Sequence, residues 1–221
     1  MYKGQKIVAI IPARANSKRC PGKNCRLING KPMVAWTIES AVNSKLLDQV
    51  IVTSDDPNVL EIAKGYKDVL TINRPPHLAT DEAESLDVVL HALEQVKGEY
   101  DYGLLLQPTS PLRLSEDIDN AITLCGDSTA KTCVSFTEIG KPSSFYYGST
   151  KLGLEQLDGY EKLYRANGAV YLFEIKHLLD KRVFSDLSTL PYFMPENRSV
   201  DVDTEEDFAT ALRLAGEING K

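Results

Sequence analysis

Apolar runs alternate with amphipathic segments along most of this chain, and the two patterns predict strands and helices in turn. A strand that is apolar at nearly every position is typical of a sheet covered on both faces. The alternation therefore predicts an α/β fold with a doubly wound, mostly parallel sheet. Strands are expected at residues 6–12, 49–55, 68–72, 102–106 and 131–136, and helices at 33–41, 57–66, 83–96, 115–125 and after Thr204.

The regular alternation stops at about residue 137 and resumes at about residue 163. Between these points lie turn-forming glycines, such as Gly148 and Gly159, and an aromatic run at Phe145–Tyr147. The chain of 221 residues suits one domain, 1–221, so we interpret 137–163 as an inserted arm. Exposed aromatic residues on such an arm favour packing against another surface, although a surface hairpin remains the alternative.

The first strand ends in a basic loop that carries Arg14, Lys18, Arg19 and Lys23. Open α/β sheets bind their ligands at the carboxyl edge of the strands, which is where this loop is expected. Backbone amides and basic side chains suit phosphate groups, whereas a cluster of cations in a tail would more often be a solvated surface. The loop is not a Walker motif, because Asn24 stands where Ser or Thr is required, and the dinucleotide fingerprint is absent.

A second polar motif lies near the end of the chain, where Asp201 and Asp203 alternate with valines. On an extended segment both carboxylates point the same way. Two neighbouring carboxylates suit Mg²⁺, which is usually bound through one or two of them together with phosphate oxygens and water. The acids that follow Thr204 are explained as the first turn of the last helix. The sequence therefore predicts a magnesium site at Asp201 and Asp203.

Four short segments together resemble the acylneuraminate cytidylyltransferases, also called CMP-sialic acid synthetases. They are I-P-A-R at 11–14, S-K-R at 17–19, G-K-N at 22–24 and G-K-P-M at 30–33. The resemblance implies a CTP-dependent transferase with the fold of the nucleotide-sugar transferases. Such an enzyme moves CMP from CTP to the anomeric hydroxyl of an acidic nine-carbon sugar and releases pyrophosphate. It also implies that the arm at 137–163 forms a homodimer.

The resemblance assigns roles to particular residues. Arg14 and Lys23 would stabilise the leaving pyrophosphate, and Asp201 and Asp203 would bind the Mg²⁺ that takes part in catalysis. Arg74 follows the third expected strand, and its loop would hold the cytosine base. The implied nucleotide-binding residues are Arg14, Ser17, Lys23, Asn24, Arg74, Ala83 and Ser85. The implied sugar-binding residues are Gln107, Arg165, Asn167 and Tyr171, where Arg165 and Asn167 are either ligand-binding or loop-locking groups.

The sequence departs from the family in the region expected to bind the sugar carboxylate. Relatives that use N-acetylneuraminate often carry a lysine after the proline of the arm, but Pro142 is followed here by Ser143. They also often carry an arginine shortly before the Y-R-x-N-G segment, and 154–157 offers none. Lys141, Lys162 and Arg165 are the available substitutes. N-acetylneuraminate, legionaminic acid and pseudaminic acid therefore all stay open as acceptors.

Composition excludes several other classes. The net charge of −6 argues against a general nucleic-acid-binding surface, and no apolar run is long enough to span a membrane. The four cysteines lack the C-x-x-C spacing of a zinc site, and the chain begins directly with a strand; both features favour a cytoplasmic protein with reduced thiols. A cytidylyltransferase for Kdo or another sugar, or a catalytically silent nucleotide-binding relative, remains as an alternative function.

Overall fold

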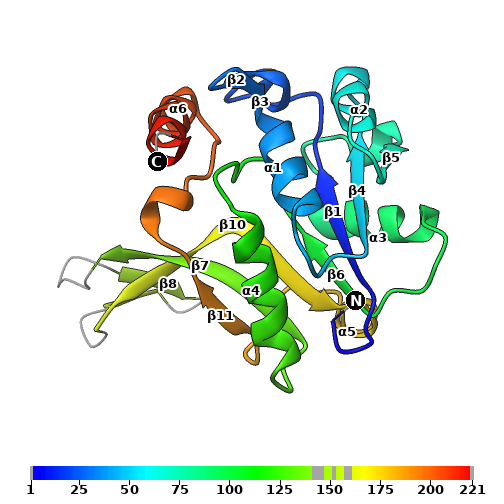
Figure 1. Ribbon diagram of the computed structural model, residues 1–221. Coiled ribbons are helices and arrows are strands. Elements are labelled where there is room, and N and C mark those ends of the chain that lie inside the picture. The colour runs from blue at the N-terminus through cyan, green and yellow to red at the C-terminus, as the bar shows by residue number, and fades with distance from the viewer. Residues whose placement is uncertain (1, 141–146, 151–152, 157–160, 220–221) are drawn as a thin grey trace.

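The computed structural model describes residues 2–140, 147–150, 153–156 and 161–219. Its main feature is a seven-stranded sheet in the order β11-β7-β10-β6-β1-β4-β5 (Figure 1). The strands are β1 (Ile7–Pro12), β4 (Gln49–Ser54), β5 (Val69–Asn73), β6 (Tyr102–Leu105), β7 (Thr132–Gly140), β10 (Leu163–Glu174) and β11 (Leu190–Phe193). The helices are α1 (Met33–Val42), α2 (Pro57–Lys64), α3 (Ser85–Gln95), α4 (Ser115–Gly126), α5 (Ile175–Lys181) and α6 (Glu205–Asn219).

The sheet is mostly parallel. β1 pairs in parallel with both β4 and β6, β4 with β5, and β11 with β7, whereas β10 runs antiparallel to both of its neighbours. After β1 the chain forms β4 and β5 on one side of that strand, and it then crosses back to form β6 on the other side of β1. The loops that follow β1 and β6 therefore diverge, which leaves a crevice at the carboxyl edge of the sheet.

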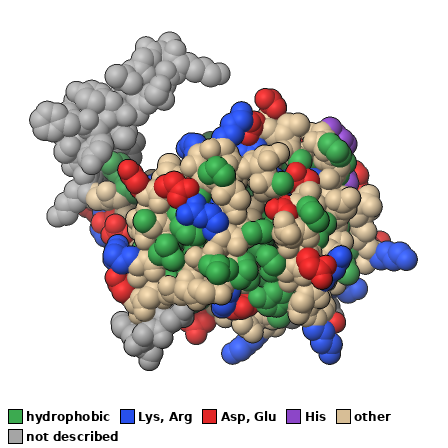
Figure 2. Space-filling view, turned by 90° about the horizontal axis from the view of Figure 1, so that it is seen from above, with side chains coloured by type: hydrophobic (Ala, Val, Ile, Leu, Met, Phe, Trp, Pro, Cys, Tyr) green, Lys and Arg blue, Asp and Glu red, His purple; other side chains and the backbone are tan. Residues whose placement is uncertain are grey.

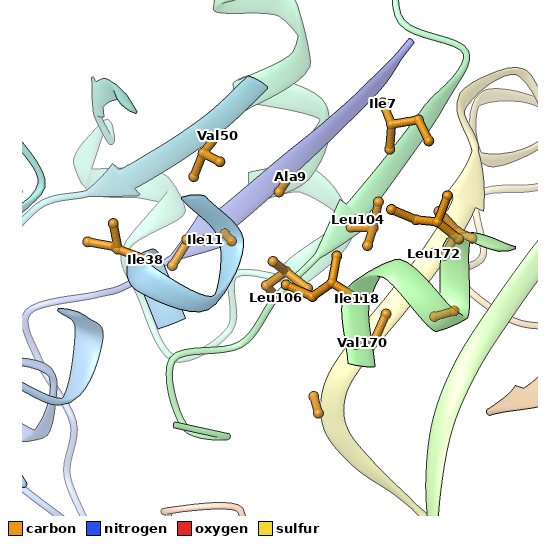
Figure 3. Packing of buried hydrophobic residues seen from close by; sticks show 14 of the residues in the cluster. Ile7, Ala9, Ile11, Ile38, Val50, Leu104, Leu106, Ile118, Val170 and Leu172 are labelled. Carbon is orange, nitrogen blue, oxygen red and sulfur yellow. The ribbon is translucent and has the colours of Figure 1, made fainter. Parts of the chain in front are cut away.

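Helices cover both faces of the sheet, as the apolar strands predict. Ile7, Ala9 and Ile11 on β1 belong to one buried cluster with residues of α1, α2 and α4. Figure 3 shows Ile11 beside Ile38 of α1, and Leu106 beside Ile118 of α4. The alternate residues of β1 point to the opposite face, where they join a second buried cluster with α3 and α5. The expected doubly wound fold is confirmed by this alternation.

Short elements differ most from the sequence-based expectation. The strand expected at 131–136 continues to Gly140, because it pairs with β10 in an antiparallel ladder that reaches Leu163. The helix α5 and the edge strand β11 were not predicted, since each is too short to show a clear period. The hairpin of β2 (Leu27–Ile28) and β3 (Lys31–Pro32) was also missed.

The expected arm begins as an extension of β7 and β10 beyond the rest of the sheet (Figure 1). Within it, β8 (Tyr147–Thr150) and β9 (Gly153–Gln156) pair as an antiparallel hairpin. Arm positions 141–146, 151–152 and 157–160, among them Lys141 and Pro142, lie outside the described residues. The hairpin fits an insertion into a single-domain chain, while the dimerisation assigned to it stays a prediction.

The C-terminal segment packs against the loop that follows β1. Val202 and Phe208 form a third buried cluster with Cys20, Ile28 and Met33. The guanidinium of Arg26 lies 3.9 Å from the centroid of the Phe208 ring and pairs with Glu205 at 2.6 Å. Sequence segments near the two ends of the chain are thereby brought to one side of the sheet.

The upper face of the molecule carries no single-sign patch in the part that is described. Figure 2 shows basic and acidic side chains interspersed there with hydrophobic ones. Within the described ranges, no helix has both the length and the apolar composition needed to cross a membrane.

Candidate functional site

A cavity of about 620 Å³ opens at the carboxyl edge of the sheet, at the crevice beside β1 and β6. Four segments line it: the loop after β1, the loop 74–85 after β5, the loop after β6 and the segment 201–203. Each follows a strand of the sheet or packs against such a loop. The sequence-based expectation of a ligand site at this edge agrees with the position of the cavity.

Backbone contacts hold the loop after β1 in place. The amide of Ala15 donates to Asp55 at 2.8 Å, and the side-chain amide of Asn24 donates to the carbonyl of Arg14 at 2.9 Å. Gly22 adopts a positive φ of 64° just before the short 3₁₀ helix η1 (Lys23–Cys25). This left-handed conformation favours glycine and turns the chain so that Lys23 faces inward.

Two cations at the mouth of the cavity share one carboxylate. Arg14 pairs with Asp81 at 2.8 Å and also donates to the carbonyl of Thr80 at 3.1 Å. Lys18 pairs with the other carboxylate oxygen of Asp81. The Lys18 ammonium and then the Arg14 guanidinium hold the pKa of Asp81 below its ordinary value. Asp81 therefore links the loop after β1 to the loop 74–85.

Two further cations meet at Asp203. Lys23 is only 9% exposed; its ammonium donates to the carbonyl of Val202 at 2.6 Å and to Oδ1 of Asp203 at 3.1 Å. Arg19 is mostly exposed and donates to Oδ2 of Asp203 at 2.7 Å. These contacts join residues separated by 179 to 184 positions in the sequence.

Asp201 lies in a less polar environment than Asp203. Burial raises the pKa of the Asp201 carboxyl, and the negative charge of Asp203 adds to the rise, while the Thr109 hydroxyl opposes it. The backbone beside it is fixed, because the amide of Val202 donates to the carbonyl of Thr109 at 2.7 Å. A cation placed between the two carboxylates would relieve this unfavourable burial of charge.

The donor set fits a hard cation that has other ligands as well. Asp201 and Asp203 both line the cavity and offer carboxylate oxygens. No group of three or more His, Cys, Asp or Glu side chains in the described part of the chain is arranged to hold a metal by itself. Mg²⁺ usually has few protein ligands and takes phosphate oxygens and water in addition. Two carboxylates therefore suit it in a cavity whose five basic residues could bind the phosphates.

Arg74 is a buried cation with unused hydrogen-bonding capacity. Its side chain lines the cavity, is 5% exposed, and donates from Nη2 to the carbonyl of Thr53 at 2.7 Å. Its Nε atom is buried and has no hydrogen-bond partner among the described residues. Burial lowers the pKa of Arg74 to about 10, which leaves it charged at neutral pH. A polar ligand group would satisfy the unpaired Nε–H.

The side of the cavity formed by the loop after β6 rests on a buried polar network. Arg113 is 2% exposed and donates to the carbonyls of Ala169 at 2.6 Å and Gln107 at 2.7 Å. Asn167 receives a bond from Ser135 at 2.6 Å and donates to Ser199 at 2.9 Å. Arg113 therefore holds the backbone of Gln107 at the cavity wall.

Most of the predicted site residues come together at this cavity. Its lining includes Arg14, Ser17, Lys23, Asn24, Arg74, Ala83, Ser85, Gln107, Asp201 and Asp203. Of the two roles considered for Asn167, the structure fits loop locking, because its side chain is 1% exposed and its amide atoms are hydrogen-bonded within the protein.

Arg165 and Tyr171 do not line the main cavity. Arg165 is exposed and borders a second hollow of about 380 Å³, which also contains Asp201 and Asp207. Tyr171 lies on β10 with its ring centroid 6.2 Å from that of Phe184. Burial raises the pKa of Tyr171, and the charge of Asp201 contributes. Asp201 thus lines both the main cavity and the hollow that Arg165 borders.

Sequence reasoning missed the part played by Asp81 and gave Arg19 no individual role. Asp81 belongs to the polar loop after Arg74, and its charge could have been matched with that of the basic loop. No local signal assigns Arg19 to Asp203, because the contact depends on how the two ends of the chain pack together.

Comparison with known proteins gives a consistent family assignment. The sequence profile of the cytidylyltransferase family matches residues 8–218. The "CMP-N,N'-diacetyllegionaminic acid synthase" of Legionella pneumophila is 33% identical, and the match covers 95% of this chain and 96% of that protein. The "N-acylneuraminate cytidylyltransferase" of Escherichia coli O18:K1:H7 is 34% identical over 97% of this chain. The chain spans only 53% of the length of that relative.

A more distant relative and the solved structures extend this result. The "Pseudaminic acid cytidylyltransferase" of Campylobacter jejuni is 29% identical over 95% of this chain and 96% of its own length. The structure of CMP:2-keto-3-deoxy-manno-octonic acid synthetase complexed with CTP has a TM-score of 0.73 and 18% identity, covering 96% of this chain and 99% of that one. At this identity the structural likeness supports the fold alone.

Proposed function

Because the chain belongs to the cytidylyltransferase family, we propose that it transfers CMP from CTP to the anomeric hydroxyl of a nonulosonic acid. The observation that carries the proposal is the cavity in which Arg14, Lys23 and Arg74 face Asp201 and Asp203. Three relatives with names of this class, at 29 to 34% identity over nearly the whole chain, support the acceptor class. The hydroxyl oxygen forms a bond to the α-phosphorus, and the bond from that phosphorus to the bridging oxygen of pyrophosphate breaks.

The basic loop and the loop 74–85 bind the nucleotide in this proposal. Arg14 and Lys23 stabilise the negative charge that develops on the leaving pyrophosphate, and Ser17 and Asn24 complete the phosphate site. Arg74, with its unpaired Nε–H, contacts the cytidine side together with Ala83 and Ser85. No side-chain nucleophile is needed, since positioning and electrostatic stabilisation account for this kind of transfer.

Mg²⁺ is the proposed cofactor. When bound it would neutralise phosphate charge and lower the pKa of the attacking hydroxyl. Asp201 and Asp203 are the residues proposed to hold it, and phosphate oxygens and water would supply its other ligands. Lys23 keeps Asp203 at the cavity wall through its contacts with Asp203 and with the Val202 carbonyl.

The acceptor is proposed to bind on the far side of Asp201, between Gln107, Tyr171 and Arg165. Arg165 is the proposed partner of the sugar carboxylate, because it is exposed and shares a hollow with Asp201. Lys162 is instead paired with Glu138 at 2.7 Å. Asn167 supports this region from beneath as a positioning residue, through its bonds to Ser135 and Ser199.

A homodimer formed through the arm is proposed as the assembled state. Exposed apolar residues at the base of the arm support it: Ile139 is 48% exposed, Tyr164 41% and Phe193 54%. The rings of Tyr164 and Phe193 are in contact, tilted by 44° with centroids 4.6 Å apart. Sedimentation equilibrium measures the mass directly, and a monomer at micromolar concentration would contradict the proposal.

The experiment that tests the function is pyrophosphate release from CTP and Mg²⁺ with N-acetylneuraminate, legionaminate, pseudaminate and Kdo in parallel. Release with one of the nine-carbon acids is the expected result and identifies the acceptor. Release with Kdo alone would replace the proposed acceptor class. Silence with all four sugars, alongside measurable CTP binding, would indicate a catalytically silent nucleotide-binding protein.

Asp203→Asn is the matched variant for the metal. It preserves the size of the side chain and removes one negative charge from the proposed site. We expect turnover at limiting Mg²⁺ to fall by about 100-fold or more, because charge stabilisation at the phosphates is worth several kcal/mol. Unchanged turnover across a Mg²⁺ titration would remove Asp203 from the metal site.

A further inference from the structure

The chain between Asp201 and Asp203 is held at its middle residue. The amide of Val202 donates to the carbonyl of Thr109 at 2.7 Å, and the carbonyl of Val202 accepts from the Lys23 ammonium at 2.6 Å. The Val202 side chain is fully buried. The backbone on the Asp201 side is therefore fixed by the loops after β1 and β6, whereas the backbone of Asp203 continues past these contacts.

Asp207, in the first turn of α6, fixes the other side. Its Oδ2 atom accepts from the amide of Thr204 at 2.9 Å and from the Thr204 hydroxyl at 2.8 Å, and its own amide donates to that hydroxyl at 3.2 Å. These contacts form a capping box, which begins a helix. The same Oδ2 also accepts from the amide of Asp203 at 3.1 Å. The start of the helix does not require this last contact, because Asp203 precedes the N-cap residue.

Asp207 holds Asp203 without being placed as a metal ligand. It does not line the main cavity, but borders the neighbouring hollow of about 380 Å³ together with Asp201. In the described part of the chain, no three His, Cys, Asp or Glu side chains are arranged to bind one metal ion. Asp207 can therefore act on a cation at Asp201 and Asp203 through the position of the Asp203 backbone or through its own charge.

The backbone position matters because the Asp203 carboxylate contacts only cations among the described residues. Lys23 donates to it at 3.1 Å and Arg19 at 2.7 Å. These positive groups repel a divalent cation, so they do not prepare the carboxylate to receive one. The hydrogen bond from the Asp203 amide to Asp207 has no such conflict. Mg²⁺ requires near-ideal octahedral geometry, and groups that orient metal ligands typically contribute about 10- to 100-fold to metal affinity.

We propose that Asp207 is a positioning residue for the metal site. Its carboxylate fixes the backbone of Asp203, so that Asp201 and Asp203 present their oxygens to one divalent cation in a preset arrangement. The inference rests on the proposed function. It extends the site to a residue outside the main cavity and gives Asp207 a task beyond the start of α6.

Four variants of the full chain separate position from charge and from helix stability. Asp207→Ala removes the acceptor, whereas Asp207→Asn keeps an acceptor oxygen and removes the charge. Glu206→Ala removes an equal charge from the same turn, where the Glu206 carboxylate has no hydrogen bond or ion pair among the described residues. Thr204→Ala weakens the capping box but leaves the contact between the Asp203 amide and Asp207 in place.

Two quantities are measured for each protein: the affinity for Mn²⁺ without nucleotide, by electron paramagnetic resonance of the free ion, and the midpoint of urea unfolding. In Asp207→Ala we expect Mn²⁺ to bind about 10- to 100-fold more weakly and the midpoint to fall. Asp207→Asn and Glu206→Ala should stay within about 3-fold of the unmodified protein in Mn²⁺ affinity. Thr204→Ala should lower the midpoint and leave the Mn²⁺ affinity unchanged.

Failure of the inference is distinguishable from failure of the proposed function. Equal Mn²⁺ affinities in Asp207→Ala and Thr204→Ala would limit Asp207 to the start of the helix and overturn the inference, with the transferase proposal left intact. An equal loss in Asp207→Ala and Asp207→Asn would assign the effect to charge and overturn it as well. If the unmodified protein binds no Mn²⁺, or Asp203→Asn binds it equally well, the metal site fails and the inference with it, while pyrophosphate release still tests the transfer separately.

Discussion

Gly168 on β10 lies next to two other parts of the candidate site, the loop after β6 and the segment that carries Asp201. It follows Asn167 on β10 at a register shift in the pairing with β7, and its φ is +75°. A Cβ atom at this position would lie 2.5 Å from Oε1 of Gln107 and 2.9 Å from Oγ of Ser110. Glycine is required here both by the left-handed backbone and by the close approach of the loop after β6.

Gly168→Ala is expected to lower the free energy of unfolding by about 2–4 kcal/mol, from the left-handed conformation and the displaced neighbours. The Gln107 amide would move first, because it is the end of a flexible side chain. We therefore expect a larger rise in KM for the acid sugar than for CTP. Urea unfolding and steady-state kinetics measure the two effects.

Gly30→Ala is the matched control. Gly30 has a φ of +80° with no atom within 4 Å of the added Cβ, and it follows Asn29 in the turn between β2 and β3. Gly30→Ala should lower the free energy of unfolding by about 1–2 kcal/mol, the cost of the left-handed backbone alone, and leave the KM values for the acid sugar and for CTP unchanged. Equal effects of the two substitutions would mean that the contacts around Gly168 do not matter.

The elements that carry the site are joined by buried polar groups. Asp117, in the first turn of α4, accepts from the amide of Leu114 at 2.9 Å and thereby caps the helix. The same carboxylate accepts from Arg198 at 2.7 Å and from the hydroxyl of Tyr192 at 3.0 Å. Its side chain is 1% exposed, and it ties α4 to β11 and to the 3₁₀ helix η3 (Glu196–Arg198) just before Asp201.

Asp117→Ala should lower the free energy of unfolding by about 3–5 kcal/mol, because it leaves the Arg198 guanidinium without its buried partner. The double variant Asp117→Ala/Arg198→Met should regain part of this loss. Urea unfolding measures both. Asp127→Ala is the control, since both members of its ion pair with Lys3 are exposed, and exposed pairs contribute little to stability. A similar loss in Asp117→Ala and Asp127→Ala would contradict the proposed connection.

At the scale of the whole molecule, the core cluster that packs under α1, α2 and α4 contains buried thiols, which are disfavoured in their charged form. Cys133 on β7 is fully buried, and burial raises its pKa from 9.0 to about 12, with a contribution from Cys125. Above pH 9 the unfolded chain loses the thiol proton while the folded protein keeps it. The folded state then binds more protons, so the contribution of this thiol to stability falls as pH rises from 9 to 12.

Cys133→Ala isolates this effect, because all other titrating groups are shared with the unmodified protein. The stability difference between the two proteins should be constant from pH 6 to pH 8. It should then shift in favour of the variant by up to about 1.4 kcal/mol per pH unit between pH 9 and 11. Urea unfolding under reducing conditions measures it. Parallel pH profiles through pH 11 would show that Cys133 ionises normally in the folded protein.

The sequence by itself determined the strands and helices of the sheet's main part, and the edge at which its polar loops gather. The reason is that the period of apolar residues and the residues that form turns are both properties of neighbouring positions, as in the strand 6–12 and the basic loop after it. The same locality explains why most of the predicted site residues line one cavity. Strands that run parallel bring the loops at their carboxyl ends together.

Only the tertiary structure decided which charged groups meet. The pairing of Arg19 with Asp203 spans 184 positions and depends on the packing of Val202 and Phe208 against the loop after β1. The burial of Asn167 and the separation of Arg165 from the main cavity likewise follow from how β10 crosses the sheet. Such contacts are fixed by the packing of distant segments, so no local pattern in the sequence encodes them.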